Sequence, residues 1–401
     1  MGNTPNIRFK GFTDDWEQRK LGDICSRVQG NDGRMELPTL TISAANGWMK
    51  QEDRFSGNIA GKEQTNYTLL HKGELSYNHG NSKLAKYGTV FSLQTYEEAL
   101  VPRVYHSFKV ENGSADFIEY YFATKIPDRE LRKLISSGAR MDGLLNIGYD
   151  DFMGIKMMFP SASEQDKIAE YYRALDHLIT LHQRKCDKTK KLKKFMLQKM
   201  FPKKDAKKPE IRFAGFTDDW EQRKFGDVFK EYSEKGHTEL PALAIIQGGG
   251  TVKRENSDRN LMYDKTNLSG YKMVRKDDFI VHLRSFEGGL EKSSLDGIIS
   301  PAYHTFHSDI VDSRFYYPYF RSYEFIKHKL VSHVYGIRDG RSIDIDGMKT
   351  IEIPYTSLEE QRKIGDYLDD LDHLITLHQR KCDELKEFKK YMLQNMFPQK
   401  G

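Results

Sequence analysis

The chain repeats two of its own segments, and this restricts its fold to two copies of one plan. Residues 7–23 (IRFKGFTDDWEQRKLGD) return at 211–227 with 15 of 17 positions unchanged, at an offset of 204. Residues 175–187 (LDHLITLHQRKCD) return without a change at 371–383, at an offset of 196. The sequence between these repeats aligns only with gaps. We therefore expect two domains of one fold, alike in their frame and different in their loops.

The second repeat lies in a long segment with helical spacing. Seam residues recur at alternating steps of four and three for more than four heptads, which is the a/d pattern of a coiled coil. In the two copies they are Ile168, Tyr172, Leu175, Ile179, His182, Cys186, Thr189, Lys193, Met196 and Met200, and Ile364, Leu368, Leu371, Ile375, His378, Cys382, Leu385, Lys389, Met392 and Met396. We expect Ser163 and Ser357 as N-caps and Pro202 and Pro398 as stops.

Each helix would have about 35 residues, a rod of roughly 50 Å, and a single apolar seam of this kind is not stable alone in water. We expect each helix to pair with its copy. Linker length allows either orientation, and we expect the antiparallel one, which creates a pseudo-twofold axis. The end of the second helix would then lie near the N-terminus, in a near-circular arrangement. His182, His378, Cys186 and Cys382 would be structural residues of the seam; the alternative, that they are ligands or reactive thiols, is the weaker one.

The rest of each half has short β-rich runs, glycine turns and one helical patch, which predicts a mixed α/β (α+β) fold. The expected organisation is a first domain at 1–160, a first helix at 161–202, a linker at 203–210, a second domain at 211–356 and a second helix at 357–398. No apolar run approaches the roughly 18–20 residues that cross a bilayer, and the N-terminus has no apolar signal region, so we expect a soluble, cytoplasmic protein. Three cysteines without C-x-x-C spacing indicate neither a metal site nor a disulfide framework.

Charge is unevenly distributed along the chain. Its net charge is +5, yet residues 183–208 hold 12 Lys or Arg and only two Asp, a local charge of +10. Such a run is typical of a solvated helix face, or of a surface that attracts a polyanion such as DNA. Charge alone does not decide between the two.

The stretches that differ between the halves carry residues suited to nucleic-acid recognition. Amide side chains match adenine edges, Arg matches guanine, and Lys reaches phosphates. The alternative is that these are ordinary polar loops, which is weaker for two loops at equivalent positions. The candidate DNA-binding residues are Tyr77, Asn78, Asn81, Ser82, Lys83, Lys86 and Arg140 in the first half, and His282, Arg284, Ser285, Arg338 and Arg341 in the second.

Motifs of catalysis are missing from the sequence. There is no Walker A loop, because GNIAGKEQ (57–64) has the wrong spacing, and no dinucleotide fingerprint. An Asn-Pro-Pro-aromatic string of the kind that grips a flipped adenine is also missing. We therefore expect a protein that reads nucleic acid and is not itself an enzyme.

The combination of motifs resembles the specificity subunit (HsdS) of type I restriction–modification systems. The carriers are PSASEQDKI (160–168) and PYTSLEEQRKI (354–364) before each long helix, together with the RFxGFxxxWEQRKLGD opening of each half. The resemblance covers essentially the whole chain. It implies that each domain is a target recognition domain for one part of an asymmetric, bipartite DNA site, and that the helices form a spacer between them.

The same resemblance implies partners and cofactors. The helices would dock two modification subunits (HsdM), and a restriction and motor subunit (HsdR) would join for cleavage of unmethylated DNA. The chain itself would bind no cofactor; S-adenosylmethionine, ATP and Mg²⁺ would belong to the partners, and an adenine would be flipped for N6 methylation. The candidate docking residues are Glu164, Gln165, Lys167, Glu360, Gln361 and Lys363, which could instead hold each helix start against its own domain. A rival interpretation of the whole chain is a duplicated adaptor that presents two different protein partners and binds no DNA.

Overall fold

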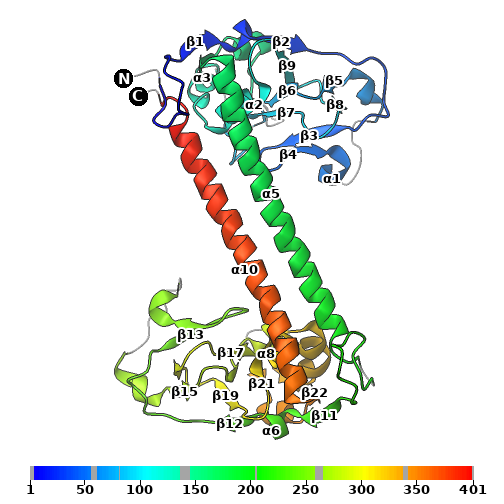
Figure 1. Cartoon of the computed structure of the whole chain (residues 1–401), viewed down its shortest axis with the longest axis vertical. Coiled ribbons are helices and arrows are strands. Elements are labelled where there is room, and N and C mark those ends of the chain that lie inside the picture. Colours follow the sequence, from blue (N-terminus) through cyan, green and yellow to red (C-terminus); the bar gives the residue numbers. More distant parts are fainter. Residues whose placement is uncertain are drawn as a thin grey trace. The chain divides into compact units, whose positions relative to one another are not determined.

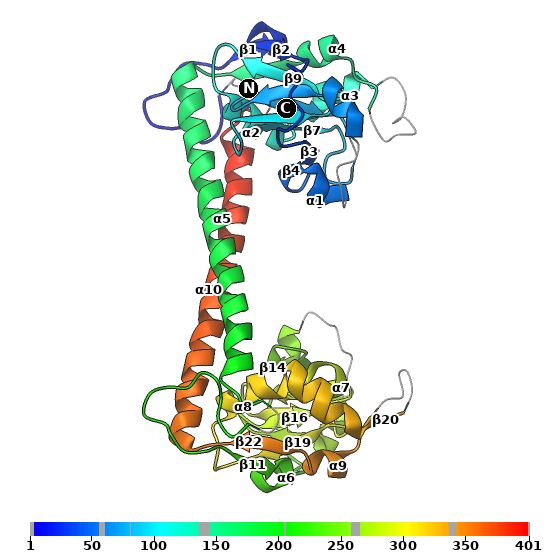
Figure 2. The same ribbon diagram turned by 90° about the vertical axis from the view of Figure 1, so that its right-hand side faces the viewer.

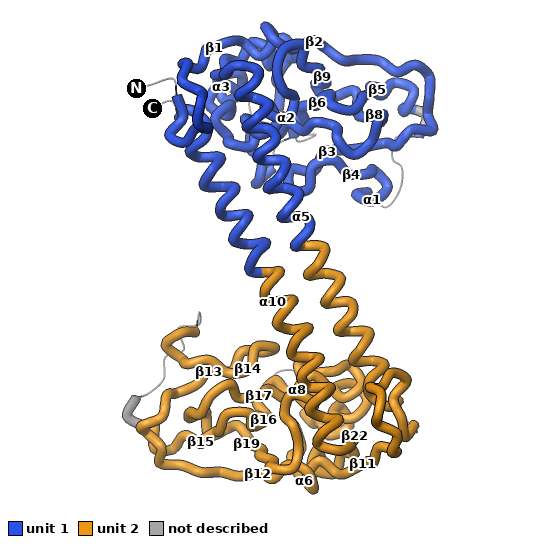
Figure 3. Tube along the Cα trace, viewed as in Figure 1, with its two compact units in different colours: residues 1–182, 380–401 blue, residues 183–379 orange. Residues whose placement is uncertain are grey.

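The computed structural model describes residues 4–55, 61–80, 82–135, 145–203, 206–257, 265–336 and 342–399. The chain forms two compact units, one of residues 1–182 with 380–401 and the other of residues 183–379. Their boundary crosses both long helices (Figure 3), so each unit contains one end of each helix.

The first unit is built on a four-stranded antiparallel sheet with the order β2-β9-β6-β7 (Figure 1). Three separate antiparallel pairs, β1 with β10, β3 with β4 and β5 with β8, complete its strands. The strands are β1 Glu17–Lys20, β2 Cys25–Val28, β3 Leu40–Ser43, β4 Gly47–Lys50, β5 Thr68–His71, β6 Leu75–Asn78, β7 Thr89–Ser92, β8 Glu98–Val101, β9 His106–Val110 and β10 Lys156–Phe159. The short helices are α1 Gln51–Phe55, α2 Ala115–Ala123, α3 Asp128–Lys133 and α4 Tyr149–Met153, with 3₁₀ turns at Leu21–Asp23 and Gly61–Asn66.

The second unit repeats this topology and adds one strand pair. Its central sheet has the order β12-β19-β16-β17, and its pairs are β11 with β22, β13 with β14 and β15 with β18. The strands are β11 Glu221–Lys224, β12 Lys230–Tyr232, β13 Leu243–Ile246, β14 Gly250–Lys253, β15 Lys272–Val274, β16 Phe279–Val281, β17 Glu291–Lys292, β18 Gly297–Ile299, β19 His304–His307, β22 Glu352–Tyr355 and an additional pair, β20 Val334–Tyr335 with β21 Ser342–Ile343. The helices are α6 Phe225–Val228, α7 Ser285–Gly288, α8 Ser313–Phe320 and α9 Ile345–Lys349, a π-helical segment η5 Glu324–Lys329, and 3₁₀ turns at Arg254–Asn256, Lys265–Gly270 and Leu330–His333. The prediction of one mixed α/β fold present twice is confirmed.

Two long helices, α5 Ala162–Lys199 and α10 Leu358–Asn395, pack together as predicted (Figure 2). In the first unit Lys389 donates to Asp176 at 2.6 Å, and in the second Lys193 pairs with Asp372. Numbers rise along α5 while their partners fall along α10, so the helices are antiparallel. Each ion pair lies at the same place in the repeat.

The N-cap of the first helix is not the predicted Ser163. Ser163 is already inside α5, and the hydroxyl of Ser161 accepts the hydrogen bond from the Glu164 backbone N–H. In α10 the predicted cap is correct, because Ser357 accepts from Glu360 N–H. Ser161 and Ser357 are 196 residues apart, the offset of the helix repeat, so the repeat register identifies the cap where the local pattern does not.

The repeated N-terminal segment explains why two distant parts of each half are kept alike. Its strand, β1 or β11, pairs antiparallel with β10 or β22, the strand that leads into the long helix. Its tryptophan enters the core of the unit and meets a phenylalanine just beyond the end of the other long helix. The ring centroids of Trp16 and Phe397 are 6.0 Å apart, as are those of Trp220 and Phe201. Opening segment, helix start and helix end therefore form one junction.

A bidentate arginine–glutamate ion pair holds each junction together. Arg8 binds both carboxylate oxygens of Glu164 at 2.7 Å, and Arg212 binds those of Glu360 at 2.6 and 2.8 Å. The glutamates are 1% and 0% exposed. Such paired hydrogen bonds to a buried carboxylate are strong and geometrically specific.

The chain returns to its start in the first unit, as expected. The backbone N–H of Ile7 donates to the carbonyl of Asn395 at 2.9 Å, and the side chains of Asn6 and Asn395 also hydrogen bond. In the second unit Ile211 makes the equivalent bond to Lys199. Among the helices that the structure describes, none has the length and apolar character needed to cross a membrane.

Removing the arginine from a junction should destabilise its unit. We expect Arg212→Ala to lower the free energy of unfolding by about 3 kcal/mol, because the Glu360 carboxylate would stay buried without its cation. Urea unfolding followed by tryptophan fluorescence measures this. Arg380→Ala, which removes an exposed ion pair with Glu384, is the control and should change stability by less than about 1 kcal/mol. Equal effects of the two variants would show that the junction pair does not hold the unit together.

Candidate nucleic-acid interface

The two candidate loops occupy the same place in the two sheets. The first follows β6, which lies between β9 and β7, and the second follows β16, which lies between β19 and β17. Their sequences differ, but the frames that hold them do not. The expectation that the loops are equivalent is therefore confirmed by the strand order.

In the first loop, the side chains of Tyr77 and Asn78 make contacts within the unit itself. Tyr77 is 0% exposed, its ring stacks on Phe152 with centroids 4.2 Å apart, and its hydroxyl donates to the Tyr87 carbonyl. Asn78 donates from its amide to the Ile42 carbonyl at 3.2 Å and accepts from Gly80 N–H at 3.0 Å. The side chain of Tyr77 thus belongs to the core and is not presented to a ligand, which corrects its choice as a contact residue.

The exposed cations of the first loop lie beyond this support. Ser82 accepts from Ala85 N–H and tightens the turn, while Lys83 and Lys86 are exposed. Among the described residues neither lysine has a carboxylate partner; the Lys86 ammonium lies 5.7 Å from the Tyr87 ring centroid. Asn81 and Arg140 lie outside the described residues.

The second loop is a short helix with one exposed cation. The Ser285 hydroxyl is buried and accepts from His282 N–H at 2.9 Å, and His282 Nδ1 accepts from Arg284 N–H at 3.2 Å. Arg284 itself is exposed. Ser285 and His282 therefore shape the turn that presents Arg284, and Ser285 is not itself available for contact. Arg338 and Arg341 lie outside the described residues.

Each loop also exposes a leucine that the sequence analysis did not select. Leu84 is 66% exposed and Leu283 is 64% exposed. Each is next to a predicted DNA-binding cation, Lys83 or Arg284, and apolar side chains in DNA readers contact the thymine methyl group. The adjacency of an apolar and a basic residue in both loops is the signal that could have identified them.

The predicted docking residues divide into buried anchors and exposed lysines. Glu164 and Glu360 are the carboxylates of the junction ion pairs. Gln165 accepts from Ser114 N–H, and Gln361 accepts from Asp312 N–H, which fixes each helix start to the first turn of α2 or α8. These four side chains are buried and hold the helix to its own unit, as the alternative interpretation stated, so they are not available as a partner surface.

The two docking lysines are exposed. Lys167 lies 3.8 Å from Glu170, and the Lys363 ammonium lies 5.1 Å from the Phe216 ring centroid. Neither contact is strong enough to prevent a partner from binding there.

Two histidines of the second unit have pKa values shifted in opposite directions. Burial lowers the pKa of His282 to about 4. Burial also acts to lower the pKa of His307, but Asp278 and Asp309, at 2.5 and 2.9 Å, outweigh it and raise that pKa above the ordinary value. His282 is therefore neutral at physiological pH, and any contact it makes is a hydrogen bond and not a phosphate ion pair.

The shifts predict opposite effects on stability. Below pH 6.5 the unfolded chain binds a proton that folded His282 does not, so its contribution is complete above pH 6.5 and is lost as the pH falls toward 4. The contribution of His307 is complete below pH 6.5 and is lost as the pH rises through its folded pKa. We expect ring-proton NMR titrations to show midpoints near 4 for His282 and above 6.5 for His307. A His282 midpoint at or above 6.5 would contradict the buried position of the ring.

The comparisons with known proteins agree on one family. Residues 217–387 match the family described as type I restriction modification DNA specificity domain. The specificity subunit of the type I restriction enzyme MjaVIII from Methanocaldococcus jannaschii is 24% identical over 411 residues, which cover 95% of this chain and 91% of that protein. The crystal structure of the type I restriction–modification S subunit from M. genitalium has a TM-score of 0.59 at 13% identity, over 99% of this chain and 100% of that one. Residues 217–387 thus match a type I DNA specificity domain, and the chain over nearly its whole length is similar to specificity subunits of type I restriction–modification systems.

Proposed function

We propose that this chain is the DNA specificity subunit of a type I restriction–modification system, without catalytic activity of its own, and that it reads an asymmetric, bipartite DNA site, with one unit on each half-site. The observation that carries the proposal is the contrast within the repeat. The two units share their strand order and their junction, whereas the loops after β6 and β16 differ in sequence at the same place. A common frame with different reading loops is suited to two different half-sites on one duplex.

In this proposal the first half-site is read from Lys83, Lys86 and Leu84, and the second from Arg284 and Leu283. Arg284 would contact a guanine in the major groove, and the leucines would contact thymine methyl groups. Lysines would add phosphate contacts that set the register. Asn81, Arg140, Arg338 and Arg341 stay predicted contacts. The two helices would fix the distance between the half-sites.

We further propose that two modification subunits dock on the long helices. Outside the seam, each long helix has a second row of side chains at steps of three and four, and the residues at both ends of this row are apolar and exposed. Each unit therefore has four such residues, two from each helix, and all are between 37% and 54% exposed. They form the docking stripe of each unit: Leu178, Leu181, Phe388 and Tyr391 in the first unit, and Leu374, Leu377, Leu192 and Phe195 in the second. Exposed apolar groups at this spacing are suited to an amphipathic partner helix.

The repeat makes these two surfaces nearly equal. Leu374 and Leu377 stand 196 residues after Leu178 and Leu181, and an aromatic side chain at 391 matches one at 195. One kind of partner would therefore bind twice. The modification subunits would bring S-adenosylmethionine and flip the target adenine, and restriction subunits with ATP and Mg²⁺ would join through them.

A map of N6-methyladenine in cells tests the reading proposal. Cells would carry the matching modification subunit with the wild-type chain, without it, or with Arg284→Glu. We expect one bipartite motif with the wild type, none without the chain, and a changed or lost second half with the variant, because a carboxylate repels the bases and phosphates that Arg284 attracts. Methylation that is unchanged when the chain is deleted would favour the adaptor interpretation.

Introducing a lysine into the exposed apolar residues of the long helices tests the docking proposal. We expect Leu377→Lys to leave complexes with one modification subunit and Leu181→Lys plus Leu377→Lys to leave none, because burying an unpaired ammonium is costly. Native mass spectrometry of the copurified complex counts the subunits. Thr376→Lys adds the same charge on a different face of α10 in the same unit, where the side chain is exposed, and should keep two. Two subunits on the double variant would place docking elsewhere.

A further inference from the structure

The end of α5 differs sharply in charge from its own repeat. Residues 184–203, in the second unit, have nine basic and one acidic residue, a net charge of +8, whereas the equivalent residues 380–399 have five and three, a net charge of +2. Lys188 and Lys191 occupy the positions of Glu384 and Glu387. A requirement of the helix pair itself would apply to both copies, so the additional charge calls for another explanation.

The two copies also differ in how their cations are paired. In the first unit Glu384 pairs with Arg380 at 2.8 Å and with Lys381 at 3.5 Å, and Glu387 lies 3.7 Å from Lys390. In the second unit no described carboxylate lies within ion-pair distance of the exposed cations Arg184, Lys185, Lys188, Lys190, Lys191 and Lys194. Their charge is therefore fully available to a polyanion.

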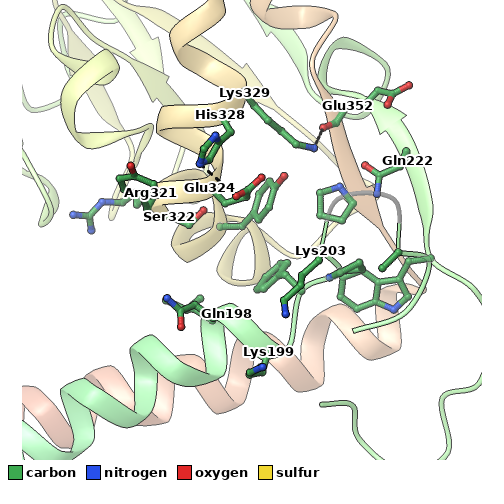
Figure 4. A pocket seen from close by; sticks show the side chains of 18 of the residues that line it. Gln198, Lys199, Lys203, Gln222, Arg321, Ser322, Glu324, His328, Lys329 and Glu352 are labelled. Carbon is green, nitrogen blue, oxygen red and sulfur yellow. Dashed lines mark hydrogen bonds and ion pairs between the residues drawn. The ribbon is translucent and has the colours of Figure 1, made fainter. Parts of the chain in front are cut away.

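Part of this basic segment forms the wall of a groove. The groove has a volume of about 1750 Å³ and lies within the second unit. Lys190 and Lys194 line it from α5, and Figure 4 shows Gln198 and Lys199 of the same helix across the cavity from His328 and Lys329. Four carboxylates also line it, but eight Lys or Arg outnumber them: Asp219, Glu221, Glu324 and Glu352 against Lys190, Lys193, Lys194, Lys199, Lys203, Lys207, Arg321 and Lys329.

The opposite wall of the groove adjoins the loop that follows β16. Arg321 lines the groove at the end of α8, and its guanidinium donates to the Gly248 carbonyl. Gly289, which follows α7 as its C-cap, lies so close to Arg321 that a side-chain carbon there would be 2.9 Å from the Arg321 Cα. A duplex held at the reading loop would thus find the groove beside it.

The groove and the docking stripe use different faces of α5. Lys190, Lys194 and Gln198 are spaced by four residues and line the groove, whereas Leu192 and Phe195 do not. At 100° per residue, Lys190 and Lys194 point about 150° away from the mean direction of the stripe. A partner helix on the stripe would leave the lysines accessible.

We propose that Lys190, Lys191 and Lys194 form a phosphate-contacting surface that holds the DNA backbone at the second unit without reading its sequence. The proposal rests on the proposed function, because it takes the duplex to lie at the loop after β16. Flexible ammonium groups without carboxylate partners suit phosphates, and each contact releases counterions. The second unit would then provide more of the salt-dependent affinity than the first.

The test measures DNA binding by the complete complex as a function of salt. One 40-base-pair duplex carries the mapped site and a second of equal length lacks it. We expect Lys190→Gln plus Lys194→Gln to reduce the slope of log K against log salt by about 2, since each phosphate contact contributes about 0.9. Both duplexes should lose affinity by the same factor.

The repeat supplies the matched controls. Lys386→Gln plus Lys390→Gln makes the same change at the equivalent positions of the first unit and should reduce the slope by less than about 1, because Lys390 already has Glu387 beside it. Lys191→Glu introduces the residue found at the equivalent position of the first unit, Glu387, and should reduce the slope by at least about 0.9, the contribution of one phosphate contact.

The outcomes separate this proposal from the proposed function. Preference of the wild-type complex for the site duplex tests the reading role, and only the slopes test the lysines. An unchanged slope in the double variant, or an equal change in its control, would overturn the phosphate surface. So would loss of the modification subunits from the variant complex, which would mean that the groove binds protein.

Discussion

The buried pair of an arginine and a glutamate at the start of each long helix is the interaction on which the rest of each unit depends. Arg8 and Arg212 come from the repeated opening segment, and Glu164 and Glu360 come from the first turn of α5 and α10. A carboxylate that is 0–1% exposed needs a cation in fixed geometry, because an unpaired buried charge costs several kcal/mol. Opening strand, helix start and helix end can therefore change only together, which is why they are preserved twice in one chain.

Around this shared junction each unit has contacts of its own, and one of them has its charges reversed. In the first unit Asp116 of α2 pairs with Arg173 of α5. In the second unit Arg314 occupies the corresponding position of α8 and pairs with Asp366 of α10. Residue 369, the repeat equivalent of Arg173, is an aspartate. If the globular part of one unit were joined to the long helix of the other, like charges would meet at this position, whereas the arginine–glutamate pair of the junction would still form.

The same division between features common to both units and features of one unit holds for the candidate DNA-binding loops. The strand order places the loops after β6 and β16 equivalently, whatever their sequence. Tyr77, Asn78 and Ser285 then support the turns from below, and Lys83, Lys86 and Arg284 remain exposed above them. Residues that shape a loop and residues that are exposed on it thus alternate over a few positions, so residue type alone does not separate the two.

The sequence by itself determined the duplication and the two long helices that pair along a seam, because identical segments and an unbroken 3–4 spacing leave few other ways to bury that seam. The spacing is compatible with either orientation of the pair, and the contacts of Lys389 with Asp176 and of Lys193 with Asp372 decided the antiparallel one. The sequence also predicted that the loops after β6 and β16 are equivalent, which the strand order confirms. Only the tertiary structure decided which side chains face outward, since burial of Tyr77, Ser285, Glu164 and Gln361 depends on neighbours far along the chain. Asp14 and Asp15 are as acidic as Glu164 in the sequence, but only Glu164 lies where Arg8 closes the junction. Burial and partnership are set by contacts between residues far apart in the chain, 156 positions for Arg8 and Glu164 and 49 for Asp312 and Gln361, and a local pattern does not carry that information.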